Sequence, residues 1–368
     1  MAPQRILYIN GGIMHRGGIE SYMMNYYRHF DRDKLQVDFI VHGFEKGVYD
    51  DEILSLGGKI YQVAVKSKTP LKNSLQIREI FKNHPYKIVH SHMDAMSYVP
   101  LKIAKQCNIP VRIAHSHNTQ HLTNNWFKYQ LNEQARKKLP KVATHFFACS
   151  KEAGIWLFGK ENESRFQIIP NAIETNKFKF SKKLRVNIRK QLHISEEAIV
   201  LGHIGRFDYQ KNHLFLLEMF ADLYKENKKF CLVMIGDGIL KAQMQNRVKE
   251  LQISESVIFV DACPNANEYY NAFDLFLLPS HFEGLGIVLI EAQTNGLKCL
   301  ASTNVPTTSN LTGNVKFLPL DKGIWVKAIM NSSIQRSENA LAEVRLAGYE
   351  IEEQAMHLQK QYEELLSR

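Results

Sequence analysis

The amino-acid sequence predicts an α/β fold with two doubly wound parallel sheets, each in a domain of its own. Three observations favour this fold: the length of 368 residues, the alternation of short apolar runs with helical patterns, and the glycine turns where apolar runs end. A chain of this length has room for two hydrophobic cores. Alternating strands and helices are typical of parallel sheets, whose ligands bind beyond the carboxyl ends of the strands.

The first half of the chain supplies one such alternating series. Strands are expected at residues 6–10, 36–42, 60–63, 88–92, 111–117 and 145–150, and helices at residues 19–27, 49–56, 75–83 and 97–107. In the loop before the first of these helices, Gly17 and Gly18 allow a phosphate or a sugar to approach the backbone closely. A glycine-rich loop alone has little specificity for such a ligand.

The second half repeats the pattern. Strands are expected at residues 199–204, 230–235, 257–261 and 275–278, a buried helix at 287–293, and an amphipathic last helix at 351–366. The polar, basic segment at residues 177–190 is expected to cross between the two domains.

Residues 277–299 combine a strand end, a glycine turn and a buried helix. The apolar strand stops at Pro279, the turn Gly284-Leu285-Gly286 follows, and the helix begins at Ile287. This arrangement directs backbone N–H groups toward an anion. The stretch is therefore a candidate ligand-binding element.

Two carboxylates belong to this stretch, Glu283 in the turn and Glu291 about two helical turns further on. An exposed turn acid and a surface helix acid would be the simplest interpretation. Glu291, however, lies in the apolar run 287–292, and a helix that is apolar nearly all round is buried. Because a buried carboxylate requires a partner and carboxylates accept hydrogen bonds from sugar hydroxyls, the pair indicates a polyhydroxyl ligand.

Two cations follow the strand at residues 199–204. Gly205 and Arg206 end this strand, and Lys211 precedes the next helix. An arginine supplies a planar fork and a lysine a point charge, so the two side chains suit a diphosphate. An exposed basic loop would explain the same residues without any ligand.

Histidines stand at two neighbouring strand ends of the first half. His90 and His92 end one predicted strand, and His115 and His117 end the next. A histidine in such a place is more often packed or hydrogen-bonded than catalytic. Because alternate residues of a strand point to the same side, His115 and His117 are both candidates for an active-site residue.

The excess positive charge lies entirely in the first half. Residues 1–180 hold 26 Lys and Arg against 15 Asp and Glu, whereas residues 181–368 hold 21 against 22. This asymmetry favours an anionic partner such as membrane lipid, a lipid-linked diphosphate or nucleic acid, although a solvated basic surface fits as well. Residues 120–141 mix aromatic with basic side chains, which suits either a membrane-interface helix or an interior-packed helix with a solvated end.

The five cysteines are widely spaced and include no CxxC pair, which favours reduced thiols in a cytoplasm. The first residues read as a strand entering a glycine loop and not as a signal peptide, and no apolar run approaches the length of a membrane span. We expect a cytoplasmic protein that associates peripherally with the inner face of the plasma membrane.

The motifs resemble those of family 4 retaining glycosyltransferases, which have the GT-B fold of two Rossmann-like domains facing each other across a cleft. The family's Glu-x7-Glu signature is present as Glu283 to Glu291, preceded by Pro279-Ser280, and its strand-end Gly-Arg and following Lys are Gly205, Arg206 and Lys211. Ala172, Glu174 and Asp261 depart from the family pattern, and Asp261 makes the selectivity for the base less secure. The resemblance implies an acceptor-binding domain at residues 1–176, a nucleotide-sugar-binding domain at 177–350, and a C-terminal helix at 351–368 that packs back on the first domain.

The resemblance also implies roles for individual residues. Arg206 and Lys211 would neutralise the leaving diphosphate, aided by backbone amides of Gly284, Leu285, Gly286 and Ile287. Glu291 would hold the ribose hydroxyls, Glu283 would contact the donor sugar, and His117 would orient the transferred sugar. Gly17 and Gly18 would border the substrate.

The resemblance implies a retaining, metal-independent hexosyltransferase without cofactors, similar to bacterial enzymes of exopolysaccharide and capsule synthesis. The expected donor is a UDP-sugar such as UDP-GlcNAc, UDP-glucose or UDP-galactose, and the expected acceptor is a glycan or a polyprenyl-diphosphate-linked saccharide. A nucleotide-sugar epimerase or hydrolase on the same fold is the alternative. Nucleic-acid binding is disfavoured because no RNP, helix-turn-helix or zinc-finger pattern is found.

Overall fold

The computed structural model describes residues 3–121, 123 and 125–367. The chain forms two compact units. Unit 1 comprises Met1–Ala172 and Ile351–Arg368, and unit 2 comprises Ile173–Glu350. The sequence prediction placed these two boundaries after residues 176 and 350.

Unit 1 is built on a parallel sheet with the strand order β3-β2-β1-β4-β5-β6-β7 among its described residues. The strands are β1 (Gln4–Ile9), β2 (Leu35–His42), β3 (Ile60–Val63), β4 (Ile88–Ser91), β5 (Val111–Ser116), β6 (His145–Ala148) and β7 (Phe166–Ile168). All eight residues of β2 are buried, as expected for a strand with helices on both faces of its sheet. The strand order reverses between β1 and β4, where doubly wound sheets bind their ligands.

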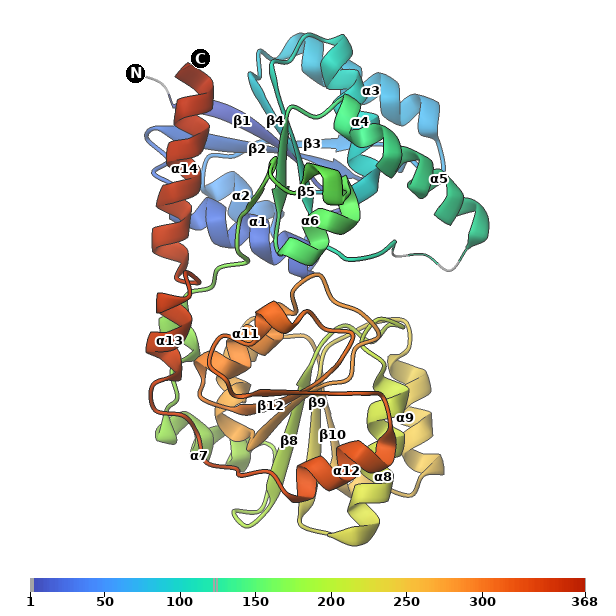
Figure 1. Ribbon diagram of the computed structural model, residues 1–368, viewed down its shortest axis with the longest axis vertical. Helices are drawn as coiled ribbons and strands as arrows, with labels where there is room; N and C mark the ends of the chain where they lie inside the picture. Colours follow the sequence, from blue (N-terminus) through green and yellow to red (C-terminus); the bar gives the residue numbers. More distant parts are fainter. Residues whose placement is uncertain (1–2, 122, 124, 368) are drawn as a thin grey trace. The chain divides into compact units, whose positions relative to one another are not determined.

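The helices of unit 1 include the last one of the described chain. They are α1 (Gly18–His29), α2 (Asp50–Ser55), α3 (Pro70–Asn83), α4 (Tyr98–Gln106), α5 (Trp126–Lys138), α6 (Lys151–Phe158) and α14 (Ile351–Ser367). Helix α14 lies beside α1 (Figure 1) and buries Ile351, Leu358 and Tyr362 in the same core as Tyr8 and Phe39. The chain therefore returns to unit 1 after completing unit 2.

Unit 2 repeats the layered architecture, with the strand order β10-β9-β8-β11-β12-β13 in the part of the chain that the structure describes. Its strands are β8 (Ile199–Ile204), β9 (Phe230–Ile235), β10 (Val257–Val260), β11 (Leu275–Leu278), β12 (Lys298–Ser302) and β13 (Val315–Leu318). Its helices are α7 (Lys182–Gln191), α8 (His213–Glu226), α9 (Lys241–Glu250), α10 (Ala266–Tyr269), α11 (Ile287–Thr294), α12 (Lys322–Met330) and α13 (Ala340–Leu346). The order reverses between β8 and β11, and the carboxyl ends of both strands carry candidate residues.

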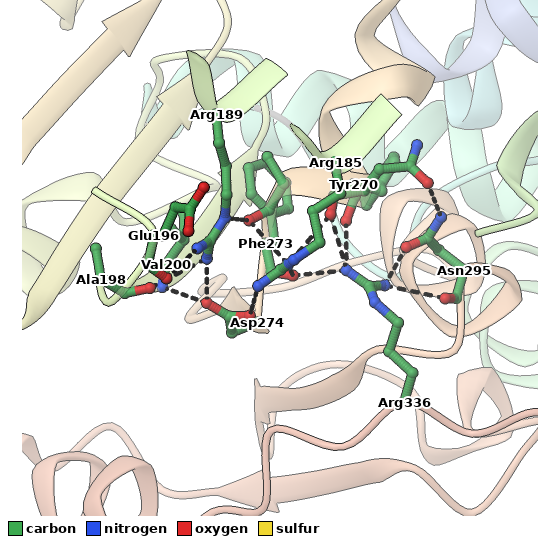
Figure 2. A network of polar contacts seen from close by, with 12 residues as sticks. Arg185, Arg189, Glu196, Ala198, Val200, Tyr270, Phe273, Asp274, Asn295 and Arg336 are labelled. Carbon is green, nitrogen blue, oxygen red and sulfur yellow. Dashed lines mark hydrogen bonds and ion pairs between the residues drawn. The ribbon is translucent and has the colours of Figure 1, made fainter. Parts of the chain in front are cut away.

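The segment expected to cross between the domains is instead largely helical and belongs to unit 2. Ser181 caps α7 by accepting a hydrogen bond from the backbone N–H of Leu184. Two arginines of α7, Arg185 and Arg189, each donate to Asp274 over 2.6 Å (Figure 2). These two arginines thus tie α7 to the residue before β11, whereas Lys182, Lys183 and Lys190 of the same segment are exposed.

A third arginine extends this network (Figure 2). Arg336 donates to the carbonyl oxygens of Tyr270, Phe273 and Asn295. Burial lowers the pKa of Arg336 to about 9, which shows how much solvation the guanidinium has lost. The main-chain acceptors compensate for that loss and connect the segment before α13 to the end of α11.

The predicted strands agree with the observed ones to within two residues wherever both exist, with His145–Ala148 two residues shorter than predicted. Helix α3 begins at Pro70, five residues before the predicted start at residue 75, because proline is well suited to the first helical position. The predicted helical segment 120–141 includes residues 122 and 124, which lie outside the described residues. Of the described ones, Trp126 to Lys138 form α5, with Asn125 as its N-cap, and Leu139 to Lys141 form a short 3-10 helix.

Candidate functional site

Glycines shape the turn after β8 and place Lys211 over the end of the strand. A Cβ atom on Gly205 would lie 3.0 Å from Cγ and 3.1 Å from Cδ of Lys211. Gly236, after the neighbouring strand β9, has a φ of +150°, and its Cβ would lie 2.1 Å from the Gly205 carbonyl oxygen. A side chain at position 236 would force the two turns apart, and one at position 205 would displace the Lys211 stem, so the two glycines let this stem lie at the carboxyl edge of the sheet.

Lys211 and Glu283 form a buried ion pair. The Nζ atom of Lys211 lies 2.6 Å from Oε1 of Glu283, and the two side chains are only 14% and 6% exposed. Ser280 donates to the same oxygen over 2.6 Å, and Gln210 donates to Oε2 over 3.2 Å. The structure thus joins two residues that the sequence prediction had placed in separate roles. The carboxylate fixes the ammonium group, which keeps further N–H donors for a ligand.

Arg206 is held less tightly. Its side chain is 64% exposed, and its Nε donates to Asp208 over 2.7 Å. Asp208 also accepts a 3.3 Å hydrogen bond from the backbone N–H of Lys211. Only Nε of the guanidinium is bonded within the described residues, so the terminal nitrogens can turn toward a phosphate. Both predicted cations therefore belong to one turn, one fixed and one adjustable.

The turn that begins α11 presents backbone donors at the end of β11. Gly286 is the N-cap residue of α11 and has a φ of +83°, a left-handed conformation that favours glycine. The first N–H groups of a helix have no intrahelical acceptor, and they carry the positive end of the helix dipole. Because Glu283 begins this turn and binds Lys211, the predicted anion-binding amides and the lysine lie at the same strand ends.

Glu291 lies on α11 and keeps partial contact with solvent. Its Oε2 accepts a 2.6 Å hydrogen bond from the hydroxyl of Tyr270, which is fully buried. Burial raises the pKa of Glu291 to about 7, although the hydrogen bond from Tyr270 and the charge of Lys211 oppose the rise. Its Oε1 has no hydrogen bond among the described residues and is the oxygen available to a ligand.

The four strand-end histidines of unit 1 lie together on one face of the sheet. Nε2 of His90 lies 3.1 Å from Nδ1 of His115, and Nδ1 of His92 lies 2.9 Å from Nε2 of His117. The rings of His115 and His117 stack with centroids 4.1 Å apart. Burial lowers the pKa of all four, that of His117 to about 3. The cluster is therefore neutral.

His115 and His117, which the sequence could not distinguish, differ in exposure. His115 is completely buried, whereas His117 follows the last residue of β5 and keeps 7% of its surface exposed. Of the four histidines, His117 is thus the residue that keeps the most exposed surface.

The glycine loop of unit 1 contains the remaining predicted residues. A Cβ on Gly17 would meet the flexible carboxylate of Glu20 at 2.4 Å, and a Cβ on Gly18 would meet no atom within 4 Å. Glu20 accepts a hydrogen bond from Asn10 over 3.1 Å, which ties the start of α1 to the end of β1. The described residues leave the space beside Gly18 open, which is compatible with a ligand approaching the backbone there.

Helix α5 exposes its aromatic side chains. Trp126, Phe127 and Leu131 are 64%, 72% and 64% exposed, and among the residues of α5 only Ala135 is buried. The alternative of an interior-packed helix is therefore wrong. Lys128, Lys137 and Lys138 are exposed on the same helix, whereas Arg136 is bound to Glu133 and to the Trp156 carbonyl oxygen. None of the described helices is both long and apolar enough to cross a membrane.

Comparison of the chain with known proteins identifies its family. The profile described as Glycosyltransferase Family 4 matches residues 16–177, and the profile described as Glycosyl transferases group 1 matches residues 185–344. EpsF of Bacillus subtilis (strain 168), assigned as a glycosyltransferase, is 33% identical over 340 residues, which cover 90% of this chain and 88% of EpsF. The chain belongs to family 4 of the glycosyltransferases.

One further sequence relative and one solved structure are similar to this glycosyltransferase. CapH of Staphylococcus aureus, a capsular polysaccharide biosynthesis glycosyltransferase, is 25% identical over 305 residues, which cover 81% of each chain. The crystal structure of Anabaena HepE in complex with UDP and glucose superposes with a TM-score of 0.79 at 17% identity and covers 99% of both chains. The predicted family and the predicted GT-B fold are confirmed.

Sequence reasoning missed two residues of the glycosyltransferase. Tyr270, the partner of Glu291, lies 21 residues earlier in the chain, and no motif connects the two positions. Asp94, which has a φ of +47°, accepts hydrogen bonds from the backbone N–H of His117 over 2.7 Å and from Asn118 over 2.8 Å. Burial raises the pKa of Asp94 to about 6. The only sequence signal was its position just after the end of β4.

Three of the buried histidines, His90, His92 and His115, each offer a ring nitrogen within 4.8 Å of the others. The planes of His90 and His115 are 6° apart, and those of His90 and His92 are 31° apart. The lone pair of an imidazole nitrogen lies in the ring plane, so rings stacked side by side do not aim three lone pairs at one ion. The geometry fits mutual hydrogen bonding better than metal ligation.

Proposed function

We propose that this glycosyltransferase moves a sugar from a UDP-sugar to a glycan or a polyprenyl-diphosphate-linked saccharide during surface polysaccharide synthesis, with retention at the anomeric carbon. The observation that carries the proposal is the grouping of Lys211, Glu283 and the start of α11 at neighbouring strand ends of unit 2. The complex of HepE with UDP and glucose supports the choice of donor, and the role of CapH in capsule synthesis supports the product class.

The main electrostatic demand of this transfer is the negative charge that develops on the leaving diphosphate. Lys211 meets that charge with an ammonium that Glu283 has already oriented. Arg206 adds an adjustable fork, and the amides from Gly284 to Ile287 add fixed donors. Groups that are positioned before the reaction stabilise such charge most effectively, because they need not reorganise in the transition state.

The carboxylates and the histidine are proposed to hold the rest of the donor. Glu291 accepts from the ribose hydroxyls with Oε1, while Tyr270 occupies Oε2. Glu283 contacts the donor sugar and keeps Lys211 in place. His117, neutral and the most exposed residue of its cluster, orients the transferred sugar by a hydrogen bond. These cationic and amide groups supply the stabilisation of the leaving group, so we propose transfer that does not depend on a metal.

A screen of nucleotide sugars tests this function. Thermal shift and hydrolysis assays would compare UDP-GlcNAc, UDP-glucose, UDP-galactose and GDP-mannose, with and without EDTA. NMR of the transferred glycoside would read the anomeric configuration, which is fixed once the new glycosidic bond has formed. We expect one UDP-sugar to stabilise the protein, transfer with retention, and rates unchanged by EDTA. Conversion of the donor to its epimer, or hydrolysis that no acceptor diverts, would refute transfer in favour of the epimerase or hydrolase alternative.

We further propose that α5 brings the enzyme to an anionic membrane surface, where a lipid-linked acceptor would be found. The exposed aromatic side chains of α5 suit the headgroup region, and each exposed lysine near an anionic leaflet contributes about 1 kcal/mol. Salt would screen this attraction, since the Debye length is only about 8 Å at physiological ionic strength.

Vesicle co-sedimentation tests the membrane proposal. The variant Lys128→Glu/Lys137→Glu/Lys138→Glu should lose binding to anionic vesicles while keeping donor hydrolysis. Arg136 is left unchanged because it holds α5 to α6. The matched control Lys68→Glu/Lys72→Glu/Lys82→Glu makes the same charge change at exposed sites of unit 1 and should still bind. Equal loss in both variants would mean that only net charge matters, and binding equally strong to neutral vesicles would contradict the electrostatic mechanism.

A further inference from the structure

His92 belongs to the histidine cluster, and the proposed function gives its side chain no role. We propose that His92 is a positioning residue: through the hydrogen bond between its Nδ1 and Nε2 of His117, it turns the His117 ring so that Nδ1 faces the reacting sugar. This inference rests on the proposed role of His117 in the glycosyltransferase. It assigns to His92 a contribution to turnover without contact with the substrate.

The His117 ring is held from several sides. Nε2 is bonded to His92 over 2.9 Å, one face stacks on His115, and the Tyr22 ring meets it edge-on with centroids 5.1 Å apart. The backbone N–H of His117 donates to Asp94 over 2.7 Å. With Nε2 engaged, Nδ1 is the only ring nitrogen left for a ligand. The ring cannot rotate to present Nε2 without breaking the bond to His92.

Packing alone does not explain a histidine at position 92. The side chain is 1% exposed, and its Nε2 has no hydrogen-bond partner in the described part of the chain. A buried polar nitrogen without a partner destabilises the folded protein, and a leucine would fill the site without that penalty. The bond to His117 is the one hydrogen bond of the His92 side chain within the described residues. The hydrogen bond to His117 is therefore what a polar side chain at position 92 contributes.

The bond also fixes where His117 carries its proton. Both rings are neutral, because burial lowers their pKa values, so one proton lies between them. Buried N–H groups without an acceptor are rarer than buried acceptors without a donor. Because Nε2 of His92 has no partner among the described residues, we place the His92 proton on Nδ1 and leave Nε2 unprotonated. Nε2 of His117 then accepts, and Nδ1 of His117 bears the N–H. His117 thus presents a donor to an oxygen of the transferred sugar.

Three substitutions of His92 separate positioning from packing. The side-chain amide of asparagine reaches the place of Nδ1, whereas that of glutamine reaches the place of Nε2. We expect His92→Asn to keep kcat within about threefold of wild type. We expect His92→Gln and His92→Leu to lower kcat about ten- to a hundredfold, the size of effect expected for a misplaced reacting group. KM for the UDP-sugar should change less than twofold, because unit 2 residues are proposed to hold the nucleotide.

His90 provides the matched control. It is equally buried and lies two residues earlier, within β4, but its ring nitrogens bond to Tyr362 over 2.6 Å and to His115 over 3.1 Å, not to His117. His90→Asn and His90→Gln should therefore have equal kcat values. Thermal unfolding of every variant checks the folded fraction, and if His92→Leu does not fold, the comparison of asparagine with glutamine carries the test.

The possible outcomes separate this inference from the proposed function. A His92→Gln variant as active as His92→Asn would overturn positioning through Nδ1, as would a folded His92→Leu variant with wild-type kcat. If His117→Ala retains full transfer, the proposed role of His117 is wrong, whereas transfer by the enzyme itself still stands. If the wild-type protein transfers no sugar at all, the proposed function fails first.

Discussion

Replacing Glu291 by glutamine is expected to stabilise the protein and to weaken its binding of UDP. The carboxyl group has a pKa of about 7 in the folded protein and an ordinary value of 4.5. Between these values the folded protein holds a proton that the unfolded chain has lost, so the free energy of unfolding falls as the pH rises. The difference of about 2.5 pH units corresponds to about 3 kcal/mol. Glutamine keeps an acceptor for Tyr270 but has no charge to bury.

The assay is thermal unfolding of wild type and Glu291→Gln from pH 4.5 to pH 8. The two proteins should unfold at similar temperatures at pH 4.5, and the variant should gain stability steadily up to pH 7, where a gain of about 3 kcal/mol raises Tm by roughly 5–10 °C. Glu250→Gln, at an exposed position, should show no such trend. A Tm difference that does not change with pH would refute the reasoning, because it would mean that the carboxylate is not strained by burial.

The Glu291→Gln variant is also predicted to bind UDP more weakly, and three further predictions concern Tyr270, Lys211 and Asp274. At pH 8, calorimetry should show UDP binding about fivefold weaker to Glu291→Gln, since hydrogen bonds to a charged group are worth roughly 1 kcal/mol more than neutral ones; equal affinity would mean that Oε1 does not face the ribose. Tyr270→Phe removes the hydrogen bond that lowers the pKa of Glu291, so the pH midpoint of UDP binding should move upward, and an unchanged midpoint would contradict this. Lys211→Ala leaves Glu283 buried without its cation, so Lys211→Met combined with Glu283→Gln is the better test of the proposed contact between Lys211 and the diphosphate. The double variant should lower kcat about a hundredfold or more, with a smaller loss of Tm than Lys211→Ala. Unchanged turnover would mean that Lys211 does not stabilise the leaving diphosphate. Asp274→Asn leaves Arg185 and Arg189 without their carboxylate and should cost about 3–5 kcal/mol by denaturant unfolding, whereas a loss below about 1 kcal/mol would show that the carbonyl acceptors suffice.

The sequence predicted the elements of this protein better than it predicted the partners of their side chains. Strands such as β8 and β9 were found at their observed bounds, because buried parallel strands are continuous apolar runs with glycine at their ends. Lys211 and Glu283 were identified separately from motifs, yet their ion pair joins residues that are 72 positions apart. Local patterns contain no information about such a pairing until the order of β8 and β11 in the sheet is known.

The partners of the basic segment before β8, residues 177–190, could not be predicted from the sequence either. Its charges resembled those of an exposed connection, because arginine is rarely buried. Asp274 and the carbonyl oxygens of residues 272 and 273, which accept hydrogen bonds from Arg185 and Arg189, lie more than 80 residues further on. The identity of the active-site histidine could not be predicted for a related reason: alternation in β5 gives His115 and His117 the same direction, and only the three-dimensional packing leaves one of them some exposed surface.

The return of α14 to unit 1 has a consequence for the way the protein is made. Ile351, Leu358 and Tyr362 complete a core whose first strand begins at Gln4, so unit 2 is an insertion within unit 1. A ribosome releases residues in order, and unit 2 can fold as one continuous segment while unit 1 still lacks a helix over its sheet. Until α14 emerges, the histidine face of β4 and β5 is without the Tyr362 hydroxyl that binds His90. Unit 1, although its first strand is synthesised early, therefore cannot complete its core before all of unit 2 has been synthesised.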